Sequence, residues 1–116
     1  MSSTGRYMAT FNVTFNVDPG YGPFNEQLIM GVINRTVPTA KVYWNGNGAA
    51  INFTSTNSNE RAVIKLNGTD WQTFNNFVIN PGGTTTTNYG YGVQLINDAD
   101  SNVITNCTIN LNITST

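Results

Sequence analysis

Histidine is absent from this 116-residue chain, and cysteine occurs once, as Cys107. One thiol cannot form a disulfide within the chain, and a single cysteine excludes the paired spacing of thiol metal or redox sites. Without histidine, the chain also lacks the usual base that would convert this thiol to a thiolate. We therefore expect Cys107 to be a buried apolar side chain and not a nucleophile.

Charged residues are scarce too, because five Lys and Arg and six Asp and Glu make up only 9% of the chain, with a formal net charge of −1. Such a chain has no basic patch to attract phosphate, which argues against nucleic acid as a partner. No stretch approaches the roughly 18 consecutive apolar residues that a membrane span requires, and residues 1–7 lack the pattern of a signal peptide. We expect no membrane span. If the protein is exported, we expect this sequence to be a piece of its mature form.

The apolar residues that are present alternate with polar ones in short runs: TFNVTFNV at 10–17, AAINFT at 49–54 and QTFNNFVIN at 72–80. Alternation of this kind is typical of β-strands, and the first run predicts an N-terminal strand. Turn-forming clusters separate the runs, among them DPGYG at 18–22 and NGNG at 45–48. Apolar residues nowhere follow helical spacing for three turns, so the chain is predicted to be all-β.

An internal repeat is the most informative feature of the sequence. Residues 62–80 align without a gap on residues 92–110, thirty residues later, and a fainter copy aligns residues 39–53 on residues 61–75, with a period of 22. Repeats of about 20 to 50 residues that contain short strands and no helix predict the stacked coils of a β-solenoid. The identities in the longer alignment pair Val63 with Val93, Asn67 with Asn97, Asp70 with Asp100, Asn76 with Asn106, Ile79 with Ile109 and Asn80 with Asn110.

Asparagines recur at matching positions of this repeat. The alignments place Asn45, Asn67 and Asn97 at one turn of successive coils, and Asn76 and Asn106 at another. Asparagine tolerates left-handed backbone geometry, and stacked side-chain amides can form hydrogen bonds from coil to coil. We therefore expect structural asparagine ladders at these five positions. The extra residues of the longer coil, including the Gly- and Thr-rich segment 82–91, are expected to form an exposed loop.

Three segments carry a resemblance to a known family: TFNVDPGYG at 14–22, VIKLNGTDWQTFNNFVIN at 63–80 and YGYGVQLINDADSNVITNCTINLN at 89–112. They resemble the right-handed parallel β-helix of the pectin-lyase-like superfamily, and are most similar to repeats of large secreted surface proteins of the Bacteroidetes type. The resemblance implies one domain over residues 1–116, a right-handed parallel β-helix of about four to five coils. Because that superfamily includes lyases, hydrolases, adhesins and phage tail proteins, it leaves the activity open.

Three carboxylates offer a catalytic interpretation. Asp98 and Asp100 lie two residues apart on one face, and Asp70 stacks beneath Asp100, so the carboxylates would be about 5 to 7 Å apart, as in glycosidases. A lyase would instead hold Ca²⁺ on these acids and use Arg61 or Lys65 as the base. The opposing interpretation makes the acids turn residues that accept backbone hydrogen bonds. Because they share the repeat phase of turn-forming asparagines, we expect no catalytic site, no metal and no cofactor.

Aromatic residues suggest a binding role. Tyr89 and Tyr91, next to glycines, could form an exposed platform that stacks on the rings of a polysaccharide or another glycan. Trp44 and Trp71 are instead expected to cover the apolar interior. The end of the chain, INLNITST at 109–116, is strand-like and shows no cap. We therefore expect a module or fragment of a longer solenoid, or end-to-end self-association.

Together these features predict an extracellular or cell-surface scaffold module for adhesion or carbohydrate contact, without catalysis. The alternative is a remnant of a polysaccharide lyase or glycoside hydrolase, with Asp70, Asp98 and Asp100 at its site. The scaffold is favoured because a plausible catalytic base is missing, whereas polar coil faces and tyrosine-bearing loops are present.

Overall fold

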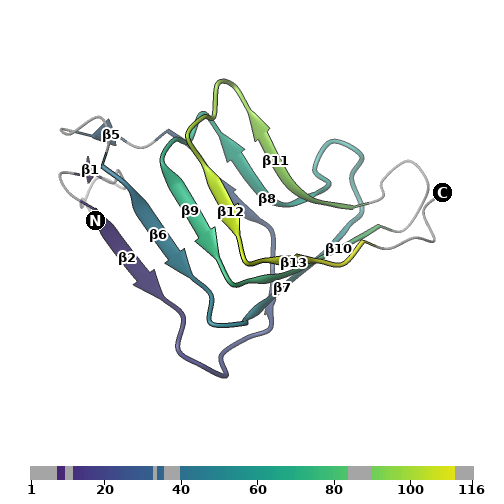
Figure 1. The fold of residues 1–116 in the computed structure, drawn as a ribbon. Helices are drawn as coiled ribbons and strands as arrows, with labels where there is room; N and C mark the ends of the chain where they lie inside the picture. Colours follow the sequence, from purple (N-terminus) through teal and green to yellow (C-terminus); the bar gives the residue numbers. More distant parts are fainter. Residues whose placement is uncertain (1–7, 10–11, 33, 36–39, 84–89, 112–116) are drawn as a thin grey trace.

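The computed structural model describes residues 8–9, 12–32, 34–35, 40–83 and 90–111 (Figure 1). Every regular element in these ranges is a β-strand, and none of them forms a helix that is long and apolar enough to cross a membrane. The strands are β1 (Met8–Ala9), β2 (Val13–Asn16), β3 (Phe24–Asn25), β4 (Leu28–Met30), β5 (Asn34–Arg35), β6 (Val42–Asn45), β7 (Ala50–Ser55), β8 (Ala62–Asn67), β9 (Gln72–Asn75), β10 (Val78–Gly83), β11 (Tyr91–Ile96), β12 (Val103–Thr105) and β13 (Thr108–Ile109).

The strands form three larger parallel sheets. The first sheet has the order β12-β9-β6-β2, the second β13-β10-β7-β3 and the third β11-β8-β4, while β1 and β5 form a separate parallel pair. The chain visits the first, second and third sheets in turn and then returns to the first, so each of these strands from β6 onward lies against the strand one circuit earlier (Figure 1). This arrangement confirms the all-β class and is that of a β-solenoid-like fold.

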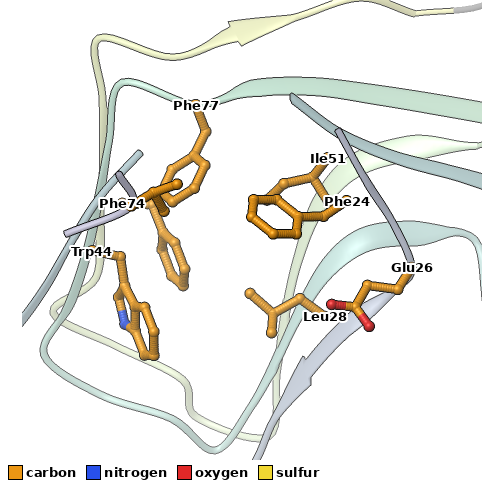
Figure 2. Close-up of a pocket in the computed structure, with 8 residues that line it drawn as sticks. Phe24, Glu26, Leu28, Trp44, Ile51, Phe74 and Phe77 are labelled. Carbon is orange, nitrogen blue, oxygen red and sulfur yellow. The ribbon is translucent and has the colours of Figure 1, made fainter. Parts of the chain in front are cut away.

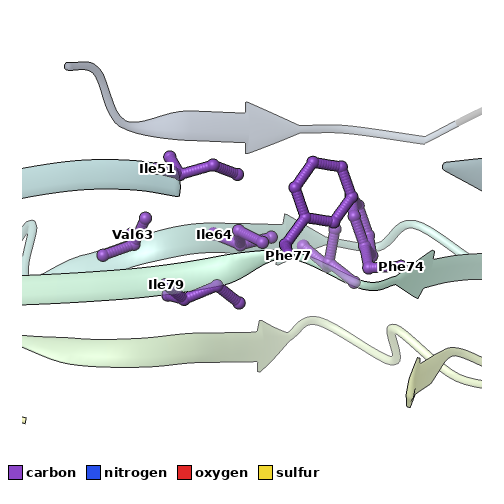
Figure 3. Close-up of a cluster of buried hydrophobic side chains, with 7 residues drawn as sticks. Ile51, Val63, Ile64, Phe74, Phe77 and Ile79 are labelled. Atoms are coloured by element: carbon purple, nitrogen blue, oxygen red, sulfur yellow. The ribbon is translucent and has the colours of Figure 1, made fainter. Parts of the chain in front are cut away.

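Apolar side chains stack in register from circuit to circuit and fill the interior. In the first sheet the ring of Trp44 stacks on those of Phe15 and Phe74, with centroids 4.6 Å and 6.1 Å away. Figure 2 shows Trp44 next to Phe74. In the second sheet Phe24 pairs with Ile51, and the same row continues through Ile79 and Ile109. Where the three sheets meet, the buried centre consists of Ile51, Val63, Ile64, Leu66, Phe74, Phe77 and Ile79 (Figure 3).

The strand register shows that the predicted 22-residue period is wrong. Asn45 pairs with Asn75 on one side and Asn16 on the other, and not with Asn67. Asn45 ends β6 of the first sheet, whereas Asn67 ends β8 of the third, so they lie at different corners. Both are followed by glycine, and the Asn-Gly pair is a local turn signal that can mark any corner. A 30-residue spacing holds in the first sheet, where Trp44 pairs with Phe74 and Phe74 with Ile104. In the third sheet the spacing is one residue shorter, so Val93 pairs with Ile64 and not with Val63 as the gap-free alignment predicts.

The corner segments differ in length from circuit to circuit. The connection from the first sheet to the second shortens from residues 17–23 through residues 46–49 to residues 76–77. The expected loop at 82–91 is only partly correct, because Gly82 and Gly83 extend β10 and pair with Thr54 and Ser55. Residues 84–89 lie outside the described residues. The expected N-terminal strand at 10–17 is present as β2, with Thr10 and Phe11 also outside that range.

Candidate functional site

Asparagine side chains form a ladder along the outside of the first sheet. Asn45 Nδ2 donates to Asn16 Oδ1 at 3.1 Å, and Asn75 Nδ2 donates to Asn45 Oδ1 at 3.2 Å. Asn106 Nδ2 extends the row by donating to Asn75 Oδ1 at 2.9 Å. Of the expected positions, Asn45 and Asn106 therefore belong to this ladder, and Asn45 is separate from the Asn67 ladder.

Two further ladders run along the other sheets. Asn97 Nδ2 donates to Asn67 Oδ1 at 2.7 Å at the end of the third sheet, as the 30-residue repeat predicts. The second sheet carries a longer ladder that the sequence analysis missed, although the pairing of Asn80 with Asn110 in the repeat was its visible signal. Its bonds run from Asn52 to Asn25 at 3.1 Å, from Asn80 to Asn52 at 2.8 Å and from Asn110 to Asn80 at 2.8 Å.

Asn76 has a backbone role and is not a ladder residue. Its φ is 59°, in the left-handed region, and that of Asn106 in the next circuit is 52°. The backbone carbonyl of Asn76 accepts a hydrogen bond from the Gly48 N–H at 2.8 Å, and its own N–H donates to Thr105 O. In the described part of the chain the ladder bonds at this turn are made by the side chain of the neighbouring Asn75, which donates to Asn45 and accepts from Asn106.

The acids of the catalytic interpretation occupy one corner, between the third sheet and the first. Asp70 Oδ1 accepts a hydrogen bond from the backbone N–H of Asp100 at 2.8 Å, so the two residues stack as the repeat implies. Asp98 and Asp100 are exposed, and Asp98 has a left-handed φ of 60°. Within the described ranges no group of three or more His, Cys, Asp or Glu side chains is arranged to hold a metal ion. The corner therefore has turn geometry in which one carboxylate supports the backbone of the next circuit.

Both candidate bases have partners on the third sheet. Lys65 Nζ lies 3.0 Å from the carboxylate of Glu60, and Gln27 Nε2 donates to the same carboxylate at 3.3 Å. The hydrogen bond from the Lys65 ammonium, helped by its charge, holds the pKa of Glu60 below the ordinary value of 4.5. The guanidinium of Arg61 lies over the ring of Tyr91, 5.2 Å from its centroid.

Tyr91 is the described member of the predicted aromatic platform, and Tyr89 lies outside the described residues. Tyr91 begins β11, is half-buried, and donates its backbone N–H to Arg61 O at 3.1 Å. Gly92 beside it is a packing requirement, because a Cβ there would lie 2.8 Å from the Ile109 side chain. The predicted exposed platform is therefore a half-buried tyrosine ring with a guanidinium over it, at the start of the third sheet.

The two tryptophans have different environments. Trp44 lies in the interior stack, and its Nε1 donates to Gln72 Oε1 at 2.8 Å, so it covers the core as expected. Trp71 lies at the corner between the third and first sheets with a left-handed φ of 61°, and Lys41 Nζ is 5.8 Å from its ring centroid. Trp71 thus joins a cation–π contact at the surface and is only half-buried.

A cavity of about 140 Å³ opens into the interior at the β2–β4 end of the fold (Figure 2). Its walls are apolar apart from the Glu26 carboxylate, so it is an extension of the core and not a polar active site. No local sequence signal marks it, because its walls come from three sheets. The lining residues are Val17, Phe24, Glu26, Leu28, Trp44, Ile51, Phe74 and Phe77.

Cys107 is a structural residue in the last circuit. Its Sγ accepts the backbone N–H of Phe77 at 3.5 Å and lies 3.2 Å from the carbonyl oxygen of Thr105. The side chain is half-buried and not fully buried as the sequence predicts. The position directly above Phe77 is the one that the 30-residue repeat predicts.

Comparisons with known protein families, with curated proteins and with solved structures give no match for this chain.

Proposed function

We propose that this chain is a non-catalytic scaffold module that serves in adhesion or carbohydrate contact outside the cell or at the cell surface. In this proposal the solenoid is a right-handed parallel β-helix of about four to five coils, related to the pectin-lyase-like superfamily. The observation that carries it is the bond from the Asp100 N–H to Asp70 Oδ1. The Asp70 carboxylate accepts a hydrogen bond from the backbone of the next circuit and so supports a corner of the fold. The three asparagine ladders likewise use polar side chains to link successive circuits.

The carbohydrate part of the proposal rests on Tyr91. An aromatic face suits stacking on the apolar face of a sugar ring. The Arg61 guanidinium lies over one face of the ring, 5.2 Å from its centroid, so a sugar would stack on the opposite face of Tyr91. The low net charge of −1 favours a neutral polysaccharide or glycan over a highly charged one.

The Tyr91→Ala variant tests this site. We expect affinity for the best ligand on a glycan array to fall by about tenfold, because the stacking surface is removed. The matched control is Tyr21→Ala, since Tyr21 is 64% exposed and lies in the connection between β2 and β3, away from β11. An equal loss in both variants, or no loss in Tyr91→Ala, would contradict the proposed site.

The second candidate is a remnant of a polysaccharide lyase or glycoside hydrolase, and it is favoured by the stacking of Asp70 and Asp100 at one corner. Replacing Asp70, Asp98 and Asp100 together by Asn decides between the two. Asn at position 70 keeps an Oδ1 acceptor for the Asp100 N–H, so the corner should fold as before. The scaffold proposal predicts unchanged glycan binding and no polysaccharide cleavage by either protein, whereas cleavage that the substitution abolishes would establish the enzyme.

A further inference from the structure

All the asparagine ladders point in the same direction. In each bond the Nδ2 belongs to the residue later in the chain and the Oδ1 to the residue one circuit earlier. In a row of amides linked in this way, the first amide uses only its oxygen and the last uses only its N–H group. One end of the row therefore presents an N–H donor, and the other end presents an oxygen acceptor. The two long ladders, on the first and second sheets, therefore give the two ends of the solenoid opposite hydrogen-bonding character.

The donor end is formed by β2 and β3. Asn16 and Asn25 accept through Oδ1 from the next circuit, and no described residue accepts from their Nδ2 groups. The acceptor end is formed by β12 and β13, where Asn106 and Asn110 donate inward and no described residue donates to their Oδ1 atoms. All four side chains are exposed. The donor end of one copy can therefore bond to the acceptor end of another copy. Two donor ends, or two acceptor ends, are not complementary.

The backbone edges at the two ends have matching geometry. Within the described residues β2 and β3 have a hydrogen-bonded neighbour on one side only, and so do β12 and β13. Every existing pairing in the first and second sheets is parallel, so a copy translated along the axis presents β2 and β3 in the orientation that β12 and β13 require. None of these four strands contains a charged residue, which would otherwise discourage strand addition.

Apolar residues of the interior rows are exposed at these same ends. Phe15 begins the Trp44 row and is 40% exposed, while Ile109 ends the Ile79 row and is 44% exposed. The interior cavity also opens at the β2–β4 end, between Phe24 and Trp44. A further circuit placed there would bury these side chains in the way the inner circuits bury Phe74 and Ile79, which are fully buried.

We propose that a second copy of this chain docks head to tail, with its β2 and β3 edges on β12 and β13. The Asn16 and Asn25 amides of one copy then donate to Asn106 and Asn110 of the next, and the interior rows run on across the contact. Because donor and acceptor ends differ, the contact is heterologous and produces open filaments instead of closed dimers. This inference does not depend on carbohydrate binding at Tyr91.

The double variant Asn16→Asp/Asn25→Asp is the sharpest test. Each Asp keeps the oxygen that accepts from Asn45 or Asn52, so the internal ladders remain, but the outward donor becomes a charged acceptor. Acceptors then face acceptors at the contact. Sedimentation velocity over a concentration series should show the unaltered chain forming assemblies of increasing mass, and the association constant of the variant should be lower by about tenfold or more.

The matched control is Asn57→Asp/Asn67→Asp, which changes the formal net charge equally. Asn57 and Asn67 accept through Oδ1 from the Asn59 N–H and the Asn97 side chain, and Asp can do the same. Neither residue lies on the strands of the contact, so this control should associate like the unaltered chain. Ile109→Lys is a second variant, from the acceptor end, and it should lose association as well. Circular dichroism establishes that each variant is folded.

Mixing separates head-to-tail stacking from other modes of association. The Asn16→Asp/Asn25→Asp chain retains the β12 and β13 edge, so it can join an assembly at one end and then block growth. Small amounts of it should shorten the assemblies of the unaltered chain. A chain that stays monomeric at all concentrations, a folded double variant that associates normally, or assemblies that the variant does not shorten would each overturn the inference. Glycan binding, measured separately, reports on the proposed function alone.

Discussion

At the scale of single residues, asparagine has two distinct structural roles in this protein. Asn75 uses its side chain, since its Nδ2 donates to Asn45 and its Oδ1 accepts from Asn106. The next residue, Asn76, uses its backbone, with a left-handed φ of 59° that most L-residues adopt only at a cost. The two roles occupy adjacent positions, which is why composition alone does not distinguish them.

The backbone role of Asn76 predicts the effect of two substitutions. Asn76→Ala should lower the free energy of unfolding by about 1 kcal/mol. Alanine pays the steric cost of the left-handed conformation and has no polar side chain whose local hydrogen bonds could offset it. Asn76→Gly should be neutral or stabilising, since glycine adopts this φ freely. Urea denaturation measures both. Asn59→Ala is the control, an exposed asparagine without a left-handed φ, and a loss there as large as in Asn76→Ala would contradict the backbone explanation.

At the scale of strands and turns, the close approach of successive circuits restricts which residue fits a corner. Gly46 is buried at the turn after β6, and a Cβ there would lie 2.6 Å from Asn76 O and 2.6 Å from the ring of Phe77. Such distances are shorter than real contacts, and one neighbour is backbone that cannot simply rotate away. The corner therefore depends on glycine for space.

Gly46→Ala should consequently destabilise the fold by about 1 to 3 kcal/mol, the usual cost of overpacking. Gly31→Ala is the matched control, because a Cβ at Gly31 meets nothing within 4 Å and its backbone is not left-handed. Chemical denaturation should show a clear loss in the first variant and a small change in the second. Equal stabilities of the two variants would show that the turn relaxes without cost.

Much of the element structure could be predicted from the sequence, because alternation and the 30-residue repeat are local or nearly local signals. They gave the strand class, the stacking of Asn67 with Asn97 and of Asp70 with Asp100. The 22-residue period failed because Asn45-Gly46 and Asn67-Gly68 are the same turn signal at different corners. The interior cavity was not predictable, since its walls come from strands that the chain brings together only in three dimensions.

At the scale of the whole molecule, polar side chains mark the corners while apolar rows fill the interior. The ladders give the solenoid a direction, and the Asp70 carboxylate bonds the backbone of the next circuit. In the scaffold that we propose, Tyr91 is the described residue that we assign to ligand contact, with Arg61 over its ring. This interpretation depends on the register between successive circuits. The register decides which asparagines form each ladder and which strands lie at the two ends of the fold.

The most direct test of that register is disulfide cross-linking in a Cys107→Ser background. Position 45 pairs with position 75 in adjacent parallel strands, whereas position 67 lies in another sheet. A disulfide forms readily only between Cα atoms up to about 7 Å apart. Mild oxidation should therefore cross-link Asn45→Cys/Asn75→Cys within one chain and leave Asn45→Cys/Asn67→Cys reduced. Cross-linking of the second pair but not the first would contradict the 30-residue coil.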